Sequence, residues 1–348
     1  MSIDIVSVIT PSFNRADLVM ETAYSIMKQT YSYWEWIIVD DGSNDNSWEV
    51  IQQLADKDQR IKVFQREREP KGACTCRNIA VEKSSGKYLI FLDTDDILAP
   101  FCIEQRVKAI TKKNDYDFII FPMLLFKKEI NDLNILWNIN NEKDDLHRIL
   151  AGDAICQGTG TIWKKDSFIK VGMWREDLHL WQDIELHIRS LLFPVKFEKR
   201  FDLLPDVYLR VTDGSLSRSG YYSLPKIRSR IDVFSYSCKR IKEKNLIQNY
   251  SIDLRNIALD VAMSALKASQ FKQALITLTI AESYGLLKPN EIKKIIAYLW
   301  IHRFKLYKIK SLDSYYSKRI NQFSKVQSSN IGQIRWDISL INSSGYLN

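Results

Sequence analysis

The chain of 348 residues has no apolar run that reaches the ~18 residues needed for a membrane-spanning helix. Its first residues contain neither a basic leader nor a signal-peptide cleavage site. The five cysteines are an odd number without the spacing of zinc ligands, and the four histidines form no metal-binding motif. These absences predict a cytoplasmic protein that does not span a membrane and has no metal centre built from Cys and His.

The composition is that of an ordinary folded protein, with 45% hydrophobic and 26% charged residues, and the length suits two domains. Charge is unevenly distributed along the chain. Residues 225–348 contain 21 Lys and Arg against 8 Asp and Glu, a net +13, whereas residues 1–224 contain 29 against 34, a net −5. This change of sign predicts a domain boundary, which we place between residues 1–222 and a basic helical domain at 223–348.

Short β-branched or aromatic runs alternate with segments of helical spacing in the first half of the chain. The expected strands are 5–10, 34–39, 61–64, 87–92 and 117–126, and the expected helices are 16–29, 47–55, 74–83 and 100–110. Such alternation predicts an α/β fold, a mostly parallel sheet with helices on both faces. Beyond Pro225 the pattern is almost wholly helical, with expected helices at 252–268, 271–284 and 291–307.

Two acidic loops follow expected strands, Asp40-Asp41-Gly42-Ser43 and Asp93-Thr94-Asp95-Asp96. Ligands of open parallel sheets bind beyond the carboxyl ends of the strands, so we expect both loops to line one crevice. Clustered carboxylates repel one another unless a cation is present, and a hard divalent ion accepts one or two of them together with phosphate oxygens and water. The second loop therefore suggests a metal that bridges the protein to a diphosphate, although an acidic turn without a ligand would account for the tripeptide alone.

Several motifs in a fixed order resemble those of the family 2 glycosyltransferases. They lie at residues 6–15, 37–43, 72–78, 93–96, 172–178 and 181–189, and the similarity covers roughly residues 3–220. The resemblance implies a GT-A fold, a UDP-linked sugar donor, a divalent cation (Mn²⁺ or Mg²⁺) and inversion at the anomeric carbon. It also implies a saccharide or lipid-linked saccharide as acceptor, in the synthesis of surface polysaccharide or lipid-linked oligosaccharide.

The same resemblance implies a nucleotide-sugar site made of Pro11, Asp41, Arg77, Asp93 and Thr94. Pro11 would line the base pocket, and Asp41 would accept a hydrogen bond from the uracil imide nitrogen. Arg77 would reach phosphate or base, with an ion pair to a neighbouring aspartate as the alternative. Asp93 would contact the ribose or metal-bound water.

Asp95 is the metal ligand that the resemblance implies. Two neighbouring acids can have purely structural roles, because Asp40 can simply shape its turn and Asp96 can cap the helix that follows. Many family members carry a His in the segment 208–215, where this chain has Thr212. Asp213 on the cation or Arg210 on phosphate are the candidates to replace it.

Asp183 is the residue that we expect to act as general base. A carboxylate that removes the proton of an acceptor hydroxyl during attack contributes about 10²–10⁴ in rate. The family usually has Glu-Asp at this point, whereas this chain has Gln182-Asp183, so Asp183 loses a like-charged neighbour that would raise its pKa. The alternative is an exposed acid at a helix N-terminus, favoured by the helix dipole.

The basic segment 291–308 has an aromatic apolar face and a cationic face. It either lies on an anionic membrane surface, where lipid-linked acceptors reside, or packs as an ordinary helix with a solvated basic face. Nucleic acid is not expected as a partner, because an acid-lined crevice repels phosphate chains. Two further alternatives are a sugar nucleotidyltransferase, whose Gly-rich phosphate loop is missing from Thr10 to Arg15, and a non-catalytic scaffold.

Overall fold

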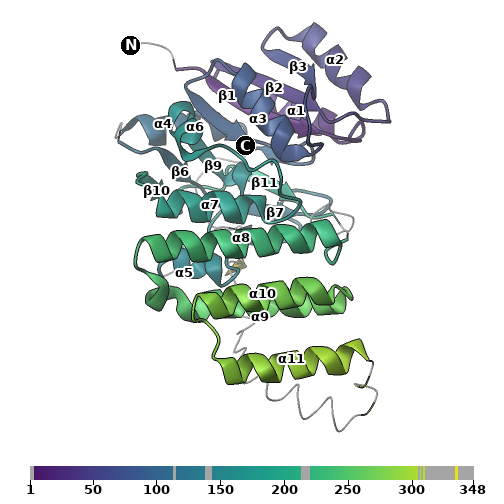
Figure 1. Ribbon diagram of the computed structural model, residues 1–348. Helices are drawn as coiled ribbons and strands as arrows, with labels where there is room; N and C mark the ends of the chain where they lie inside the picture. Colours follow the sequence, from purple (N-terminus) through teal and green to yellow (C-terminus); the bar gives the residue numbers. More distant parts are fainter. Residues whose placement is uncertain are drawn as a thin grey trace.

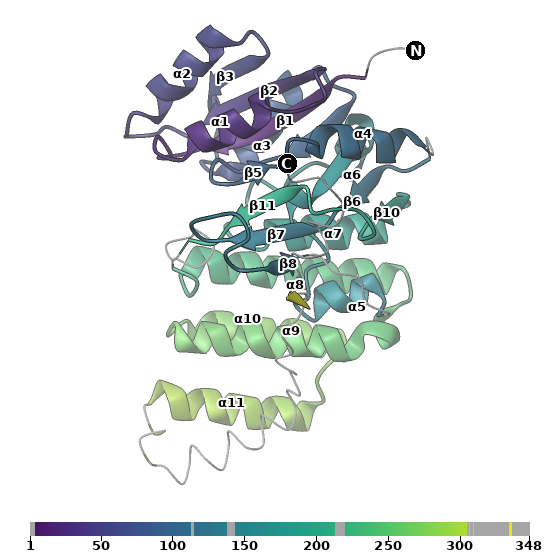
Figure 2. The same cartoon turned by 180° about the vertical axis from the view of Figure 1, so that it is seen from behind.

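The computed structural model describes residues 4–112, 115–137, 143–212, 220–304, 306, 309 and 334–335. One end of the molecule is a layered arrangement of strands and helices, and the other is a stack of helices (Figures 1 and 2). The sheet precedes the stack in the chain, so the N-terminal part of the protein lies at one end and α11 at the other.

The larger sheet has the strand order β10-β6-β9-β4-β1-β2-β3. Strands β1, β2, β3 and β4 are parallel neighbours, β6 is parallel to β10, and β9 runs antiparallel to both β4 and β6. The sheet is therefore mostly parallel, as expected from the sequence. Its strands are β1 (Val6–Ser12), β2 (Trp34–Asp40), β3 (Ile61–Gln65), β4 (Tyr88–Phe91), β6 (Phe118–Ile120), β9 (Thr161–Lys164) and β10 (Phe197–Lys199).

Helices join these strands and cover both faces of the sheet, as its two separate apolar cores show. One core packs α1, α2 and α4 against the sheet, and the other packs α3, α6 and α7 against it. A parallel sheet with both faces buried needs apolar strands throughout, and β1, β2 and β4 have no exposed residue. The helices are α1 (Val19–Met27), α2 (Ser47–Lys57), α3 (Ala73–Lys83), α4 (Cys102–Lys112), α5 (Asp145–Leu150), α6 (Lys165–Val171) and α7 (Gln182–Leu192).

The single strand expected from Asp117 to Phe126 is wrong, because the structure divides it between two sheets. Residues of β6 belong to the larger sheet, whereas β7 (Met123–Phe126) belongs to a second sheet of order β12-β8-β7-β11-β5. Pro122 lies between them, and a proline has no N–H to donate to a continuous ladder. The other strands of the second sheet are β5 (Ile97–Leu98), β8 (Ile135–Trp137), β11 (Val207–Arg210) and β12 (Ile334–Arg335).

The helical stack consists of α8 (Leu224–Glu243), α9 (Ile247–Lys267), α10 (Phe271–Ser283) and α11 (Pro289–Arg303). The expected helices 252–268, 271–284 and 291–307 correspond to the last three. The apolar core of the stack continues into α5 and α7, since Leu150 and Ile188 belong to the same buried cluster as Phe234 and Leu259. Among the described residues, no helix is long and apolar enough to cross a membrane.

Candidate active site

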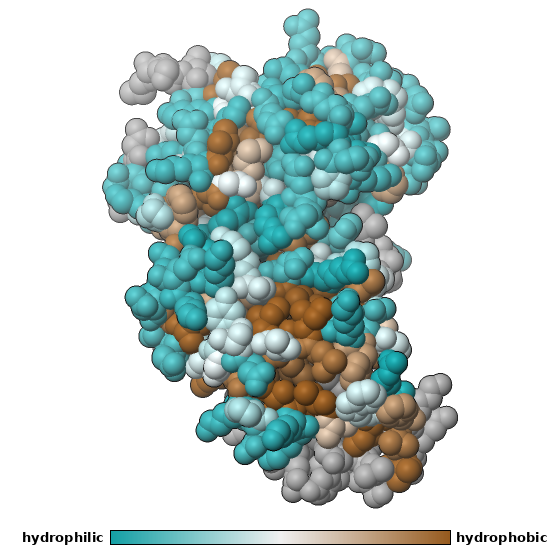
Figure 3. Space-filling view, in the orientation of Figure 1, coloured by the Kyte–Doolittle hydropathy of each residue, from teal (hydrophilic) through white to brown (hydrophobic). Residues whose placement is uncertain are grey.

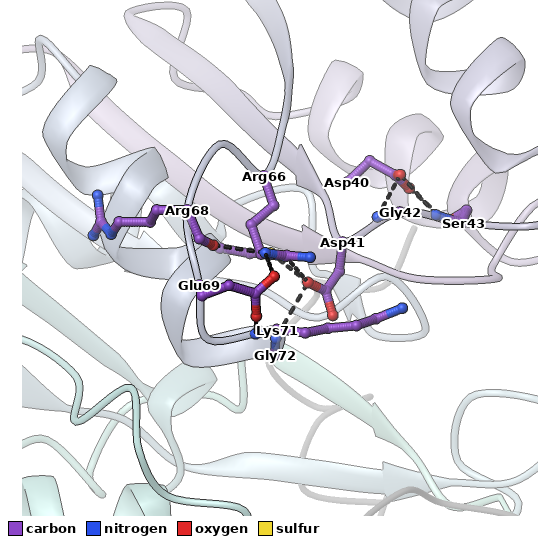
Figure 4. Close-up of polar contacts among 10 residues, drawn as sticks. Asp40, Asp41, Gly42, Ser43, Arg66, Arg68, Glu69, Lys71 and Gly72 are labelled. Carbon is purple, nitrogen blue, oxygen red and sulfur yellow. Dashed lines mark hydrogen bonds and ion pairs between the residues drawn. The ribbon is translucent and has the colours of Figure 1, made fainter.

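The loop after β2 is organised by Asp40. Its Oδ2 accepts hydrogen bonds from the backbone N–H groups of Gly42 (2.9 Å) and Ser43 (2.8 Å), and its Oδ1 accepts one from the Ser43 hydroxyl (2.5 Å). Gly42 has a φ of +79°, a conformation that costs little for glycine and that tight turns require. Asp40 therefore shapes its own turn (Figure 4).

Asp41 is buried and held by groups from β3 and from the start of α3. Its Oδ1 accepts hydrogen bonds from Arg66 Nε (2.7 Å) and from the Gly72 N–H (3.2 Å), and its own N–H donates to the Ser12 carbonyl (2.8 Å). Arg66 in turn donates to the Arg68 carbonyl and to Glu69 (Figure 4). The negative charge of Asp41 is thus balanced by the protein itself.

Pro11 lies directly beside this loop, at the carboxyl end of β1. It is partly buried and faces Val39 in the parallel β1–β2 ladder. Pro11 is therefore close to the start of the Asp41 loop, and its role in a base pocket stays a prediction.

The second acidic loop follows β4 and is not balanced in this way. Asp96 is buried, and its Oδ1 accepts the backbone N–H of Arg210 (3.0 Å), so its partner is β11. Burial raises the pKa of Asp95, and the charge of Asp93 raises it further. Burial likewise raises the pKa of Asp96, to which the charges of Asp95 and Asp93 add. When carboxylates lie close together without a cation, the charge of one makes ionisation of the next less favourable.

The backbone of this loop is fixed by α1 and β11. The Thr22 hydroxyl donates to the carbonyls of Thr94 (3.0 Å) and Asp96 (2.8 Å), while Arg210 Nε donates to the Asp95 carbonyl (3.0 Å). The Arg210 guanidinium also pairs with Glu21. Thr94 is buried. Hydrogen bonds to main-chain carbonyls thus fix the conformation of the loop. The carboxylate of Asp95, in contrast, forms no ion pair with a cation among the described residues.

Arg77, in the second turn of α3, joins the acidic loop to the helix. Its Nη2 donates to Asp93 Oδ1 (2.6 Å), and its guanidinium carbon lies 5.0 Å from the centre of the Trp174 ring. The ion-pair alternative weighed from sequence is thus present in the structure. Although burial lowers the pKa of Arg77, the charges of Asp93 and Asp183 raise it above its usual range. Arg77 therefore carries a permanent positive charge that interacts with both Asp93 and Asp183.

Asp183 lies in the first turn of α7, and its Oδ1 accepts the backbone N–H of Gly158 (2.7 Å). Burial raises the pKa of Asp183, while the nearby charge of Arg77 and the Gly158 N–H lower it and the charge of Asp93 raises it. A Cβ atom added to Gly158 would lie 3.2 Å from Asp183 Oδ1 and 3.0 Å from the Trp174 ring, so a side chain there would crowd this contact. Asp183 is accordingly a partly buried acid that faces the Arg77–Asp93 pair, and the exposed alternative does not hold.

The turn that carries Gly158 is anchored by a buried ion pair. Arg106 Nε and Nη2 donate to both carboxylate oxygens of Asp206 (2.9 and 2.7 Å), and both side chains are fully buried. The remaining Nη1 donates to the carbonyls of Thr159 (2.8 Å) and Thr161 (3.0 Å). The Thr161 hydroxyl then donates to the Gly158 carbonyl (2.8 Å). A bidentate buried pair therefore fixes the short 3₁₀ turn Gly158–Gly160 that contacts Asp183.

The sequence interpretation missed these supports for identifiable reasons. Arg66 could have been found, because in the β2–β3 register Gln65 lies opposite Asp40, which puts Arg66 next to Asp41. Gly158, Arg106 and Asp206 are distant in sequence from Asp183 and belong to no recognised motif. Of the candidates to replace the family His, Thr212 lies two residues beyond β11 and Arg210 donates to the acidic loop, whereas Asp213 lies outside the described residues.

The residues present fit a hard divalent cation with substrate oxygens. No group of three or more His, Cys, Asp or Glu side chains that could hold a metal occurs within the described part of the chain. Mg²⁺ and related ions are usually bound by only one or two carboxylates, with substrate phosphates and water as the remaining ligands. Asp95, partly buried beside Asp93 and with no cation partner among the described residues, provides that limited set.

The site combines two acidic loops at the carboxyl ends of parallel strands with a partly buried acid on α7, and both features are compatible with a sugar-transferring enzyme. The model of glycosyl transferase family 2 matches residues 7–172. The beta-1,3-glucosyltransferase WfaP of Escherichia coli is 30% identical over 231 residues, which cover 64% of this chain and 83% of that protein. The chain belongs to glycosyl transferase family 2.

Other curated relatives match over a shorter length. The putative teichuronic acid biosynthesis glycosyltransferase TuaG of Bacillus subtilis is 46% identical over 110 residues, 32% of this chain and 43% of that protein. An uncharacterized glycosyltransferase of Rickettsia bellii is 37% identical over 238 residues, 66% of this chain and 32% of that protein. The alignments thus span less than half the length of these two relatives.

Two solved structures share the fold. S. aureus TarS 1-349 in complex with UDP-GlcNAc has a TM-score of 0.58 and 18% identity, over 80% of this chain and 91% of that chain. The mannosyltransferase PcManGT from Pyrobaculum calidifontis, in complex with GDP-Man and Mn²⁺, has a TM-score of 0.51 and 14% identity, over 93% and 88% of the two chains. At these identities the likeness shows the fold alone, and that fold is the GT-A type expected from the sequence motifs.

Proposed function

We propose that this protein transfers a sugar from a UDP-linked donor to a hydroxyl group of a lipid-linked saccharide, with inversion, during synthesis of a surface polysaccharide. The single observation that carries the proposal is the position of Asp183, whose carboxylate is held by Gly158 beside the Arg77–Asp93 pair. The name of the 36% identical relative WfgD of Escherichia coli, a UDP-Glc:alpha-D-GlcNAc-diphosphoundecaprenol beta-1,3-glucosyltransferase, supports the donor and acceptor class.

In this proposal Asp183 is the general base. The Gly158 N–H fixes one carboxylate oxygen, which leaves the other oxygen to accept the proton of the attacking hydroxyl. Burial raises the pKa of Asp183, which makes its ionised form a stronger base than a solvated aspartate. Attack by the hydroxyl on the anomeric carbon, from the face opposite the nucleotide, inverts its configuration.

The donor binds between the two acidic loops. Asp41 accepts a hydrogen bond from the base, with Pro11 beside it, and Thr94 and Asp93 lie on the ribose side. Asp95, with water-mediated help from Asp93, would hold Mn²⁺ or Mg²⁺, which when bound neutralises negative charge that builds on the departing diphosphate. Arg77 supplies a second, permanent positive charge close to the same place.

The two parts of the chain have different roles in this proposal. Residues 1–222 are the catalytic domain, and the basic helices that follow, α8 to α11, bring the enzyme to its acceptor. A lipid-linked acceptor resides at a membrane surface, so the enzyme is expected to work there as a cytoplasmic, peripherally bound protein. Nucleic acid has no place in this scheme.

Donor turnover tests the proposal and separates it from its rivals. The full chain is incubated with Mn²⁺, a panel of UDP- and GDP-sugars and a diphospholipid-linked GlcNAc acceptor, and both the released nucleotide and the product are measured. Release of UDP together with an inverted glycosidic bond supports the proposal. In a parallel incubation with added pyrophosphate, formation of UTP and sugar 1-phosphate from the UDP-sugar would identify a nucleotidyltransferase, and binding of the donor without any turnover would identify a scaffold.

A further inference from the structure

The last two helices of the stack expose an unusual combination of side chains, here called the α10–α11 surface. Trp300 and Phe304 are 44% and 62% exposed, and on α10 Ile276 is 39% exposed. Figure 3 shows a broad apolar area over the lower helices of the stack. Large exposed apolar side chains that cluster mark a site of interaction, whereas single ones are common on protein surfaces.

The aromatic rings of this surface form a continuous contact. The Trp300 ring lies 4.9 Å from that of Phe271 and stacks on Phe304 at 5.4 Å, with an interplanar angle of 14°. Trp300 and Phe304 are four residues apart at the end of α11 and so occupy one face of the helix. Phe271 begins α10, which means that the cluster bridges two helices that pack together.

Exposed cations lie on the same two helices as the aromatic cluster. Lys272, Lys293 and Arg303 are exposed and form no ion pair with a described residue, and the Arg303 guanidinium lies 5.4 Å from the centre of the Phe271 ring. The acid of the first turn of α11, Glu291, is already paired with Arg255 at 2.9 Å. The exposed charges of α11 at described positions are therefore all positive.

We propose that the α10–α11 surface docks the enzyme on an anionic lipid bilayer, with the aromatic rings at the headgroup level and the cations on the lipid headgroups. Tryptophan is enriched at this depth of a bilayer, and Lys and Arg residues near an anionic surface add to binding. The inference rests on the proposed lipid-linked acceptor, since that substrate makes a bilayer the relevant partner.

A second copy of the chain fits the surface less well. A symmetric contact would bring Lys272, Lys293 and Arg303 of both copies together, and like charges at an interface oppose association. A bilayer supplies the opposite charge and an apolar layer at the same time. Helix α1 provides a comparison within the chain. It also exposes large side chains, Tyr24 (65%) and Met27 (44%), but it carries the acid Glu21 in its first turn.

Vesicle co-sedimentation of the full chain tests the docking without any substrate. Wild type is expected to bind vesicles of phosphatidylglycerol and phosphatidylcholine at least tenfold more tightly than vesicles of phosphatidylcholine alone, and to be released by high salt. Trp300→Ser with Phe304→Ser should weaken binding about tenfold or more. Lys272→Gln with Lys293→Gln should weaken it by about fivefold for each charge, because these exposed residues leave the helix packing intact.

The matched control is Tyr24→Ser with Met27→Ser, which removes two side chains of similar exposure from α1 and should leave vesicle binding unchanged. Loss of binding in this control but not in the α11 variants would overturn the inference, as would wild type that ignores anionic vesicles. A shift from dimer in wild type to monomer in the α11 variants, seen by light scattering without vesicles, would assign the surface to a second copy instead. Because no sugar is transferred, these outcomes are independent of the proposed reaction.

Discussion

The two acidic regions of the candidate site differ in how the protein compensates their charge. In the loop after β2, N–H groups of its own turn bind Asp40, and Asp41 is paired with Arg66 and accepts the Gly72 N–H. Asp95 and Asp183, in contrast, are partly buried acids with raised pKa values, and the arginine whose charge acts on Asp183, Arg77, is paired with Asp93.

In the proposed function, this difference separates residues that bind the donor from residues that take part in the reaction. A carboxylate that the protein has already paired is fixed in position and suits recognition of a neutral base. Carboxylates that the protein leaves under-compensated store unfavourable electrostatic energy, which is relieved when a cation or a proton arrives. We therefore expect substitutions in the first region to change affinity and stability, and substitutions in the second to change turnover.

The largest effect is expected for Asp183→Asn. Removing the base should lower kcat by about 10²–10⁴-fold while the affinity for the UDP-sugar stays the same, because Asp183 belongs to the acceptor side. Single-turnover kinetics and equilibrium donor binding measure the two quantities. Asp177→Asn is the matched control, since Asp177 is an exposed acid nearby that pairs with Arg175, and its kcat should not change. Equal losses in both variants would show that the loss of kcat is not specific to the proposed base.

Asp95→Asn should reduce donor turnover by roughly 10²-fold or more, and by more than Arg77→Ala, because it removes the proposed cation ligand. The stability of the Asp95→Asn variant, in contrast to its turnover, should not fall. An acid whose pKa is raised in the folded state destabilises the fold as the pH rises through that pKa, so at neutral pH the neutral Asn should leave the Tm equal or higher in the absence of a divalent cation. Thermal melts with EDTA check this, and a Tm well below wild type would show that Asp95 is structurally paired after all.

For Asp41→Asn both the stability of the fold and the affinity for the donor should fall moderately. The charge-assisted bond to Arg66 is weakened, at a cost of about 1–3 kcal/mol in the free energy of unfolding, and the donor KM should rise about tenfold with kcat nearly unchanged. Urea unfolding and steady-state kinetics provide the measurements. A fall in kcat with an unchanged KM would instead mean that Asp41 acts on the reacting groups and not on the uracil ring of the donor.

The smallest effect is expected for Thr161→Val, which removes the hydroxyl that holds the Gly158 carbonyl. Asp183 then loses part of the N–H bond that lowers its pKa, so its pKa should rise further. Because the base works ionised, activity is lost as the pH falls through this pKa, and the acid limb of the kcat profile should move to higher pH. Full activity at high pH with only the limb displaced is the expected pattern; an unshifted limb would mean that the turn does not tune Asp183.

Much of the fold was predictable because local patterns and global topology agree in the first hundred residues. Each expected strand up to β4 and each helix up to α4 exists, and both acidic loops lie at the carboxyl ends of parallel strands. Prediction failed where partners are distant in sequence. The pairing of β7 with β11 has no local signal, and neither has the Arg106–Asp206 pair, whose members are 100 residues apart.

The same limit applies to the site. Asp41, Arg77, Asp93 and Asp95 could be named because they lie in motifs that resemble those of the family, but whether each is already paired depends on side chains brought in by folding. The core shared by α5, α7 and α8 was also unforeseen, since charge composition predicts a boundary near residue 222 but does not report which helices pack together on either side of that point.

Calorimetric titration of UDP in Mn²⁺ and in EDTA, with wild type and Asp95→Asn, is the decisive experiment for the contrast between the two acidic regions. We predict that Mn²⁺ tightens UDP binding to wild type at least tenfold and has no effect on Asp95→Asn. Equal affinity of wild type for UDP in Mn²⁺ and in EDTA would contradict the proposal that the under-compensated acids of this crevice receive a cation together with the diphosphate.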